Sequence, residues 1–386
     1  MPQSSLISSV NLARALIRAP SVTPIDAGAM DLVEAELARL GFSCRRMKFG
    51  EIENLYARRG TTSPNLCFAG HTDVVPAGDA GAWKADPFAA EVRDGVLYGR
   101  GAVDMKSAIA AFICAVEAVL AEGEPAGSLS FLITGDEEGA ARDGTRRVVE
   151  QLASEGEVID HCLVGEPTSA KTLGDMLKVG RRGSLNAWIE VNGRQGHVAY
   201  PDRASNPIPV LAQLIERLAA RRLDEGYPEF QPSNLEFTAL EVSESAVNMI
   251  PARARARLNI RFNPNHTGAA LVDWLARECA AAEAGFDGTV TLDPAISGEA
   301  FYTAPCGFTA GVIAAIRETL GVTAEPSTSG GTSDARFLRA LCPVIEFGLV
   351  GSTMHMVDER VPVAEVEALT RTYAAIIRGY FGARER

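Results

Sequence analysis

The sequence predicts an α/β protein in which a mostly parallel, mixed sheet is sandwiched by helices, with a smaller α+β domain inserted into it. Outside residues 181–294, short apolar runs typical of buried strands alternate with segments of helical spacing. Residues 181–294 are expected to form, in order, a strand, a helix, two strands, a helix and a strand, which is the order of a ferredoxin-like domain. A chain of 386 residues is long enough for both domains.

The first part of the larger domain is expected to span residues 1–180. Its apolar residues either recur at helical spacing or form continuous runs of strand length. The expected helices span residues 6–18, 27–40, 106–122 and 145–153, and the expected strands span 65–75, 128–134 and 161–165. Because helices separate consecutive strands, we expect the strands to run parallel.

The inserted domain is expected to span residues 181–294. Its expected strands cover 184–191, 235–242, 252–262 and 289–292, and its expected helices cover 206–220 and 271–284. The segment 252–262 alternates alanines and apolar residues with polar residues, mostly arginines, as a half-exposed antiparallel strand does. The larger domain then resumes over 295–386, with expected helices at 306–320 and 363–380 and an expected strand at 343–349.

Composition argues against several classes of function. The formal net charge of −12 disfavours nucleic acid and anionic membranes as partners, because both attract basic surfaces. Seven scattered cysteines with no CxxC pair predict free thiols in a reducing cytoplasm. The N-terminal residues do not resemble a signal peptide, and the most apolar helix is too short to span a bilayer.

Seven acidic or imidazole side chains follow strand-like runs or glycines, where an α/β sheet presents its functional groups. They are His71, Asp73, Asp104, Glu137, Glu138, Glu166 and His355. Such a set can hold two divalent ions and leave a position open for water. Asp104 precedes a helix and can bridge two ions. Of the adjacent glutamates, one can bind metal while the other stays free as a base.

Each of these residues also has an ordinary structural interpretation when it is taken alone. The His-x-Asp pair is typical of surface or capping pairs, and the adjacent glutamates of a solvated helix start. Asp104 could be a helix N-cap, and Glu166 could be a loop acid. Their joint occurrence after successive strands favours the metal site. His161 and His266 fit no such pattern, and we expect them to be structural or exposed.

At these residues the chain resembles the dinuclear zinc amidohydrolase and peptidase family, which includes aminoacylases, acetylornithine deacetylase and related carboxypeptidases. The resemblance covers essentially the whole chain and implies a zinc-peptidase-like fold that hydrolyses amides. It implies two divalent ions per subunit, Zn²⁺ or Co²⁺, and a cis peptide after Asp104. The implied ligands are His71 and Glu166 for one ion, Glu138 and His355 for the other and Asp104 for both, with Glu137 as general acid/base and Asp73 orienting His71.

Five further segments resemble family members that hydrolyse succinyl amides of substrates with several carboxylates. They are 179–184, 196–201, 247–251, 259–263 and 329–334. The resemblance implies that Arg182 and Arg261 anchor carboxylates through bidentate hydrogen bonds. Further substrate contacts are implied for Tyr200, Asn248, Gly331 and Thr332.

The resemblance also implies a role for His197 that involves a second subunit. In the family members it resembles, this histidine comes from the partner subunit and stabilises the oxyanion of the reaction. It therefore implies a homodimer formed through the inserted domain, which would also close as a lid.

Two other functions remain open at this point. An acetylornithine deacetylase, or another hydrolase of N-acyl amino acids, would share the metal ligands but would not depend on Arg182 and Arg261. A non-catalytic metal-dependent binding protein would have no use for the free base Glu137. Around His355, the segment 354–359 lacks the lysine and asparagine that many of the succinyl-amide hydrolases have, which we expect to affect substrate fit more than chemistry.

Overall fold

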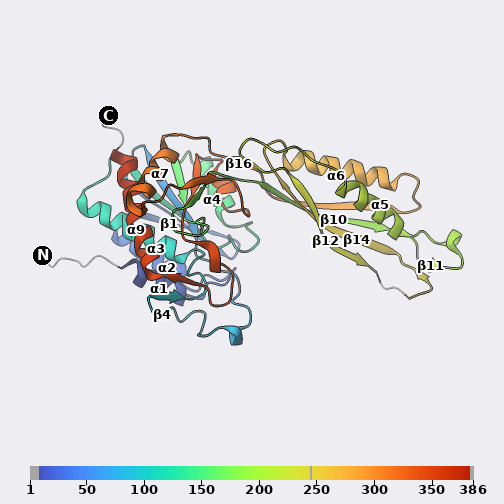
Figure 1. Ribbon diagram of the computed structural model, residues 1–386, viewed down its shortest axis with the longest axis horizontal. Helices are drawn as coiled ribbons and strands as arrows, with labels where there is room; N and C mark the ends of the chain where they lie inside the picture. The colour runs from blue at the N-terminus through green and yellow to red at the C-terminus, as the bar shows by residue number, and fades with distance from the viewer. Residues whose placement is uncertain (1–7, 244–245, 383–386) are drawn as a thin grey trace. The chain divides into compact units, whose positions relative to one another are not determined.

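A computed structural model describes residues 8–243 and 246–382, and the chain divides into two compact units (Figure 1). The larger unit takes the chain up to Val179, then residues 303–327, and the chain from Ser333 onward. The smaller unit consists of Gly180–Tyr302 and Thr328–Thr332. The chain thus leaves the larger unit and returns to it, as the predicted fold class requires.

A mixed, mostly parallel sheet of eight strands runs through the larger unit, as predicted. In spatial order its strands are β1 (Ser43–Phe49), β2 (Ile52–Arg59), β6 (Ser128–Thr134), β3 (Asn65–His71), β7 (His161–Val164), β18 (Val344–Glu346), β8 (Met176–Lys178) and β17 (Glu325–Ser327). The central strands β6, β3, β7 and β18 are parallel to one another. Every side chain of β6 is buried, so the sheet is covered on both faces.

The helices of the larger unit, in chain order, are α1 (Ser9–Arg18), α2 (Ala29–Arg39), α3 (Lys106–Glu122), α4 (Thr145–Ser154), α7 (Gly307–Leu320), α8 (Ala335–Leu338) and α9 (Val363–Gly382). Helix α3 packs against α1 and α9, α9 also packs against α7, and α4 packs against α8. Two 3₁₀ turns cover Ala80–Ala82 and Gly351–Thr353. In the described part of the chain, no helix combines the length and apolar character that crossing a membrane requires.

A cluster of aromatic side chains joins the central strands to the helices of the larger unit. Phe68 on β3 stacks on Phe112 of α3, with their ring centroids 4.3 Å apart. Phe131 of β6 and Tyr373 of α9 meet the same two rings edge-on or tilted. The Tyr373 hydroxyl also donates a hydrogen bond of 2.7 Å to the carbonyl of Phe347, just after β18. This packing fixes the strands that end at the candidate site.

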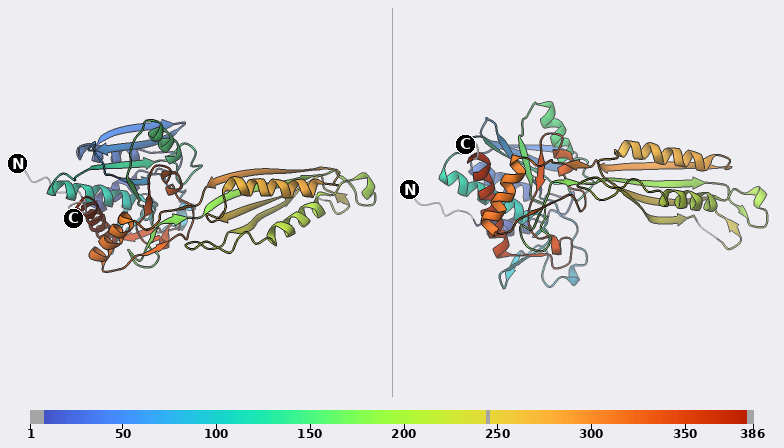
Figure 2. Two further views of the ribbon diagram at one scale, coloured as in Figure 1. Left: turned by 90° about the horizontal axis from the view of Figure 1, so that it is seen from above. Right: turned by 45° about the horizontal axis from the view of Figure 1, so that its top comes forward.

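The smaller unit is a four-stranded antiparallel sheet with two helices on one face (Figure 2). In chain order its main elements are β10 (Gly183–Asn192), α5 (Pro207–Ala219), β12 (Asn234–Val242), β14 (Arg253–Phe262), α6 (Gly268–Glu283) and β15 (Thr289–Gly298). The strands lie in the order β12-β14-β10-β15. Short elements complete the unit, namely β9 (Gly180–Arg181), β11 (Gly196–His197), a 3₁₀ turn (Pro201–Arg203), β13 (Met249–Ile250) and β16 (Phe301–Tyr302).

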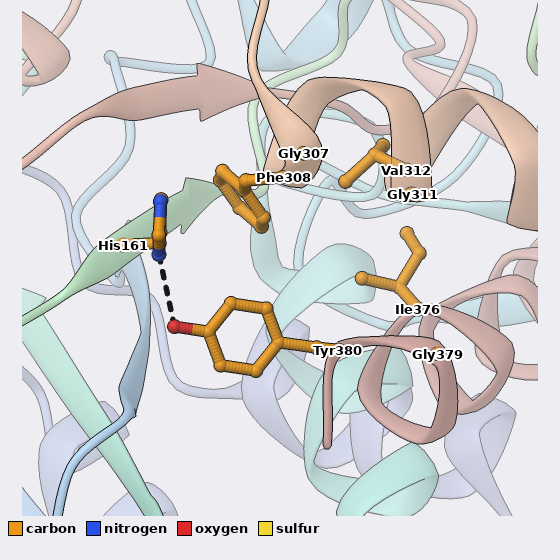
Figure 3. Close-up of a pocket in the computed structure, with 8 residues that line it drawn as sticks. All are labelled: His161, Gly307, Phe308, Gly311, Val312, Ile376, Gly379 and Tyr380. Carbon is orange, nitrogen blue, oxygen red and sulfur yellow. Dashed lines mark hydrogen bonds between the residues drawn. The ribbon is translucent and has the colours of Figure 1, made fainter. Parts of the chain in front are cut away.

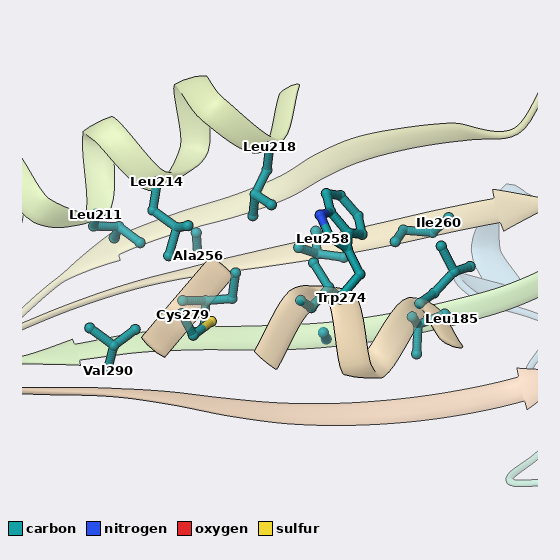
Figure 4. Close-up of a cluster of buried hydrophobic side chains, with 14 of the residues drawn as sticks. Leu185, Leu211, Leu214, Leu218, Ala256, Leu258, Ile260, Trp274, Cys279 and Val290 are labelled. Atoms are coloured by element: carbon teal, nitrogen blue, oxygen red, sulfur yellow. The ribbon is translucent and has the colours of Figure 1, made fainter. Parts of the chain in front are cut away.

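The core of the smaller unit lies between this sheet and its two helices (Figure 4). Leu211, Leu214 and Leu218 of α5 and Trp274 of α6 pack onto the strands. On β14, alternate residues from Ala254 onward are buried, while the arginines between them lie on the other face. The predicted alternation of this strand is therefore confirmed.

The hydrogen-bonded carboxylate of Asp224 is expected to make the stability of the smaller unit sensitive to acid. Its carboxylate accepts hydrogen bonds from the Asn263 amide, the Gly226 N–H and the His266 ring, at 2.7, 2.7 and 3.0 Å. Burial opposes ionisation, but the hydrogen bonds from Ser233, Asn263 and Gly226 outweigh it and lower the pKa of Asp224 to about 2. A depressed carboxyl pKa contributes stability above the unfolded value and loses it as pH falls through the folded value.

We therefore expect the smaller unit to lose stability between about pH 4 and pH 2 as Asp224 takes up a proton. Urea unfolding at several pH values should show that Asp224→Asn is less stable than the parent protein at pH 7 but loses less on acidification. Asp287, which pairs with Arg194 on the surface, offers a matched control as Asp287→Asn. Equal acid sensitivity of the parent and Asp224→Asn proteins would contradict the prediction.

Several elements of the larger unit were not predicted from the sequence, among them β8, β17 and α8. The hairpin of β1 and β2 was missed because only one β1 side chain is buried, so β1 has no apolar run. The small sheet of β4 (Glu91–Arg93), β5 (Val96–Tyr98) and β19 (Arg360–Pro362) was missed because its strands have three residues each. The expected helix at 6–18 begins at Ser9, and residues 6 and 7 lie outside the described residues.

Candidate metal centre

The larger unit brings the predicted metal-type side chains together at the carboxyl ends of its parallel strands. His71 is the last residue of β3, Glu137 and Glu138 follow β6, and Glu166 follows β7. Asp104 lies two residues before the start of α3. His355 comes later in the chain, after the 3₁₀ turn that follows β18. Parallel strands end at one edge of a sheet, so residues far apart in the sequence meet there.

One triad consists of His71, Asp104 and Glu166. The Nε2 atom of His71 lies 3.1 Å from Asp104 Oδ1 and 3.7 Å from Glu166 Oε1. All three residues are buried. Each offers one ligand atom, and these atoms lie within 4.8 Å of one another. This is the spacing of donors that could surround a single ion.

A second triad consists of Asp104, Glu138 and His355. The Nε2 atom of His355 lies 2.8 Å from Glu138 Oε1 and 3.4 Å from Asp104 Oδ2. Asp104 therefore belongs to both triads, with Oδ1 directed to one histidine and Oδ2 to the other. A carboxylate with its two oxygens so divided can bridge two cations.

The carboxylates and imidazoles of this cluster lie close enough to shift one another's pKa values, and together they are suited to bind cations. Burial raises the pKa of Glu166 well above its usual range, and the nearby charge of Asp104 adds to the rise. Burial alone would lower the pKa of His71, but the hydrogen bond to Asp104 and the neighbouring carboxylates raise it well above its usual range. Hydrogen bonds to Asp104 and Glu138 raise the pKa of His355 to about 10. Imidazole and carboxylate donors in this number suit divalent ions such as zinc.

Asp73 links His71 to the two adjacent glutamates. The carbonyl oxygen of Asp73 lies 2.9 Å from Nδ1 of His71, while its carboxylate lies 3.6 Å from that nitrogen. If the carbonyl accepts the Nδ1 proton, Nε2 is left free to bind a metal. The carboxylate accepts hydrogen bonds from the backbone N–H groups of Glu137 and Glu138, at 3.2 and 3.0 Å. Burial raises the pKa of Asp73 to about 6.

Glu137 belongs to neither triad. Among the described residues, no side chain or backbone group forms a hydrogen bond with its carboxylate. Burial raises its pKa well above the usual range, and the charge of Asp334 adds to the effect. A carboxyl group that holds a proton readily and is not engaged by other residues is suited to accept a proton and to return it.

Met105 is a component of the site that the sequence did not reveal. Its side chain lies against Gly70 and Gly165, which precede His71 and Glu166. A Cβ atom on Gly70 would lie 2.5 Å from Met105 Cε, and one on Gly165 would lie 2.8 Å from the same atom. A side chain at either position would therefore displace the end of the Met105 side chain, and one at Gly165 would also meet the Phe68 ring, whose Cζ atom would lie 2.5 Å from the added Cβ. The peptide bond between Asp104 and Met105 is cis, as the family resemblance implies.

The predicted substrate-binding residues lie in the smaller unit. Arg182 donates a hydrogen bond of 3.0 Å to the Asn234 side chain, and Asn234 pairs with Arg261 across β12 and β14. The two arginines therefore lie at the same end of the sheet. Gly331 and Thr332 belong to the short returning segment, where the Arg181 side chain donates a hydrogen bond of 3.0 Å to the Gly331 carbonyl.

His197, Tyr200 and Asn248 form a separate group at the other end of the smaller unit. The rings of His197 and Tyr200 lie 5.8 Å apart. The Val198 N–H donates to the Asn248 carbonyl at 3.1 Å, and His197 pairs with Met249 across β11 and β13. Strand β10 separates this group from Arg182, which precedes the strand. The structure therefore does not bring all the predicted substrate residues of one chain together within this unit.

The larger unit also contains an apolar cavity of about 190 Å³ between α7 and α9 (Figure 3). Phe308, Val312 and Ile376 line it, and its polar corner is His161, whose Nδ1 lies 2.9 Å from the Tyr380 hydroxyl. It contains none of the triad residues, so it is not the metal centre. His161 is a structural residue, as predicted, and so is His266, which pairs with Asp224 at 3.0 Å.

The chain is similar to known proteins over most of its length. The family model described as Peptidase family M20/M25/M40 matches residues 67–379. The chain is 66% identical over 382 residues to a succinyl-diaminopimelate desuccinylase of Caulobacter vibrioides (strain NA1000 / CB15N), covering 99% of this chain and 98% of that protein. It is also 66% identical to a succinyl-diaminopimelate desuccinylase of Phenylobacterium zucineum (strain HLK1), covering 98% and 100% of the two chains.

A solved structure shares the fold at much lower sequence identity. The M20 family metallo-carboxypeptidase Sso-CP2 from Sulfolobus solfataricus superposes with a TM-score of 0.80 at 17% identity. The match covers 97% of this chain and 99% of that chain. The fold is therefore shared over nearly the whole of both chains.

Proposed function

The chain belongs to peptidase family M20/M25/M40, and from this membership we propose that it is a succinyl-diaminopimelate desuccinylase. It hydrolyses the amide of N-succinyl-LL-2,6-diaminopimelate to succinate and LL-diaminopimelate, a step of diaminopimelate and lysine synthesis in the bacterial cytoplasm. Relatives of this name match it over nearly their whole length. The observation that carries the hydrolytic chemistry is Asp104 shared between two triads, with Glu137 uncommitted beside them.

The donors fit a pair of divalent ions, with zinc first and cobalt as the alternative. His71 and Glu166 would hold one ion, Glu138 and His355 the other, and Asp104 both. Bound ions would polarise the scissile carbonyl and acidify the attacking water. The Asp73 carbonyl, by accepting from Nδ1, would leave Nε2 of His71 free to bind an ion, and the Asp73 carboxylate holds the backbone N–H groups of both glutamates.

Glu137 moves the proton of the reaction. Its carboxylate takes the proton of the water molecule that attacks the succinyl amide carbonyl. It then delivers that proton to the nitrogen of the departing amine, because an amine leaves far more readily than its anion. The absence of competing hydrogen bonds from described residues leaves the Glu137 oxygens free for both transfers.

The smaller unit supplies the groups that recognise the substrate's carboxylates and its oxyanion. Arg182 and Arg261 at one end of its sheet present planar donors to carboxylates. Gly331, Thr332, Tyr200 and Asn248 add further hydrogen-bonding groups. His197 stabilises the oxyanion as the residue of the partner subunit in a homodimer. His197 lies at the opposite end of the unit from Arg182, which is consistent with a residue that acts in the active site of the partner subunit. Sedimentation of the protein as a monomer would contradict this part of the proposal.

A substrate panel tests the specificity. We expect the metal-loaded protein to hydrolyse N-succinyl-diaminopimelate with much higher kcat/KM than N-acetylornithine. Replacing Arg182 or Arg261 by alanine should reduce kcat/KM for the succinylated substrate by about 10- to 100-fold or more, since each removes hydrogen bonds to a charged group. The loss for a small acylated amino acid should be much smaller.

Arg257 provides the matched control for this panel. It lies on the same strand as Arg261, on the open face of the sheet, and its guanidinium lies over the Trp188 ring. We expect Arg257→Ala to leave the preference between the two substrates unchanged. Preferential hydrolysis of N-acetylornithine by the parent protein would instead identify it as a deacetylase.

A further inference from the structure

We infer that a buried ion pair, Arg100 with Glu359, positions the loops that carry the metal ligands and so sets the affinity of both metal sites. The inference rests on the metal centre proposed above. Arg100 is 2% exposed and Glu359 is fully buried. Their closest atoms, Nη1 and Oε2, lie 2.7 Å apart. Neither residue belongs to a triad, so the pair acts on the site through the backbone.

Glu359 holds the loop that presents Asp104. Its Oε1 atom accepts hydrogen bonds from the N–H groups of Val103 and Asp104, at 2.8 and 3.2 Å. Its Oε2 atom accepts one from the N–H of Gly101 at 3.2 Å, in addition to the bond from Arg100. Three backbone groups of one short loop are thus fixed by a single carboxylate. The position of Asp104 between the two histidines depends on this loop.

Arg100 connects Glu359 to two other segments that carry residues of the candidate metal site. Its guanidinium donates to the carbonyls of His355 and Met356, at 3.4 and 3.3 Å. It also donates to the carbonyl of Pro76 at 3.3 Å, three residues beyond Asp73. A planar group with five donors can serve several carbonyls at once, whereas a lysine cannot reproduce this pattern. The pair therefore touches the segments of His71, Asp104 and His355 together.

The loop of His355 needs such support because its backbone is strained. His355 has a φ of 62° and Asp358 a φ of 57°, the left-handed region that non-glycine residues rarely adopt. Arg100 bonds the carbonyl of His355, and the Asp358 carboxylate accepts a hydrogen bond from the Lys84 N–H at 2.9 Å. These contacts hold the second triad's histidine where its Nε2 atom meets Glu138 and Asp104.

Buried ion pairs often contribute only to folding. A comparison of single and double variants separates that role from the positioning of the loops that carry the metal ligands. Removing one partner strands a buried charge and destabilises the protein, whereas replacing both by apolar residues restores much of the stability. The double variant Arg100→Met with Glu359→Leu is therefore expected to be more stable than either single variant. It still lacks the hydrogen bonds to the loops, so its metal affinity should stay low.

The test is calorimetric titration of the metal-free protein with Zn²⁺ and Co²⁺, together with thermal unfolding. We expect the double variant to bind both ions about 10- to 100-fold more weakly than the parent, the usual loss when groups supporting metal ligands are removed. Glu359→Gln should lose less, because its amide oxygen can still accept from Val103 and Asp104. At saturating metal, kcat should fall while KM changes little.

The pair Arg39 and Glu117, 2.6 Å apart between α2 and α3, is the control. Arg39→Met with Glu117→Gln should alter unfolding but leave metal affinity at the parent value. If the parent protein binds no divalent ion, the proposed metal centre itself fails. If the parent binds two ions and the Arg100/Glu359 double variant binds both equally well, only the positioning inference is overturned. Should the double variant not fold, Arg100→Lys takes its place, because it keeps a cation beside Glu359 but cannot bond the carbonyls of Pro76, His355 and Met356 together. Binding of both ions by Arg100→Lys as tight as in the parent would then overturn the positioning inference.

Discussion

Replacing Glu137 by glutamine is expected to lower kcat by about 10²- to 10⁴-fold, the range that a positioned general acid or base contributes. Glutamine keeps the shape of the side chain but cannot accept the water proton or return it to the amine. Because Glu137 lies in neither triad, the variant should still bind both metal ions. The measurement is kcat for N-succinyl-diaminopimelate hydrolysis, with the metal content of the same sample determined in parallel.

Two controls make the Glu137 result specific. Glu137→Asp keeps a carboxylate on a shorter side chain and should retain more activity than Glu137→Gln. Glu124→Gln changes a surface glutamate that pairs with Arg59, and it should leave kcat unchanged. Turnover near the parent rate in Glu137→Gln, with both ions bound, would defeat the assignment of this residue as the proton carrier.

Replacing Asp104 by alanine is expected to weaken the binding of both metal ions and to abolish hydrolysis. Among the described residues, Asp104 is the one shared by the two triads, and it offers one carboxylate oxygen to each. The comparison variants are His355→Ala and Glu166→Ala, each of which belongs to one triad only. Calorimetric titration with Zn²⁺ should show two weakened sites for Asp104→Ala and one for each comparison variant.

This pattern is a demanding test because a general loss of structure would weaken all variants alike. Thermal unfolding of the metal-free proteins provides the check. Loss of a single site in Asp104→Ala, with the other intact, would contradict the shared role of this carboxylate.

The fold class could be predicted because its signals are local. Continuous apolar runs such as 128–134 form strands that are buried on both faces. The alternation of β14 follows from one face packing on helices and the other facing solvent. The site residues could be placed near one another because parallel strands end at a common edge of the sheet, and polar residues at those ends are visible in the sequence.

What could not be predicted depends on contacts between distant segments. Glu359 lies 258 residues from Gly101, to which it is hydrogen-bonded, and nothing in its neighbourhood marks it as buried. In the sequence, no local feature distinguishes Arg100 from the other arginines. Met105 appears as the first apolar residue of a helical region, although its side chain lies against the glycines that precede His71 and Glu166. Pairings of this kind are set by the tertiary fold, so no local pattern reveals them.

Five side chains of the larger unit are expected to surround two divalent ions that share Asp104. The most direct measurement is anomalous X-ray diffraction at the zinc edge from crystals grown with Zn²⁺. We predict two peaks, one beside His71 and Glu166 and the other beside Glu138 and His355, both in contact with the Asp104 carboxylate. A single peak, or peaks that leave Asp104 without a metal contact, would contradict this two-ion arrangement.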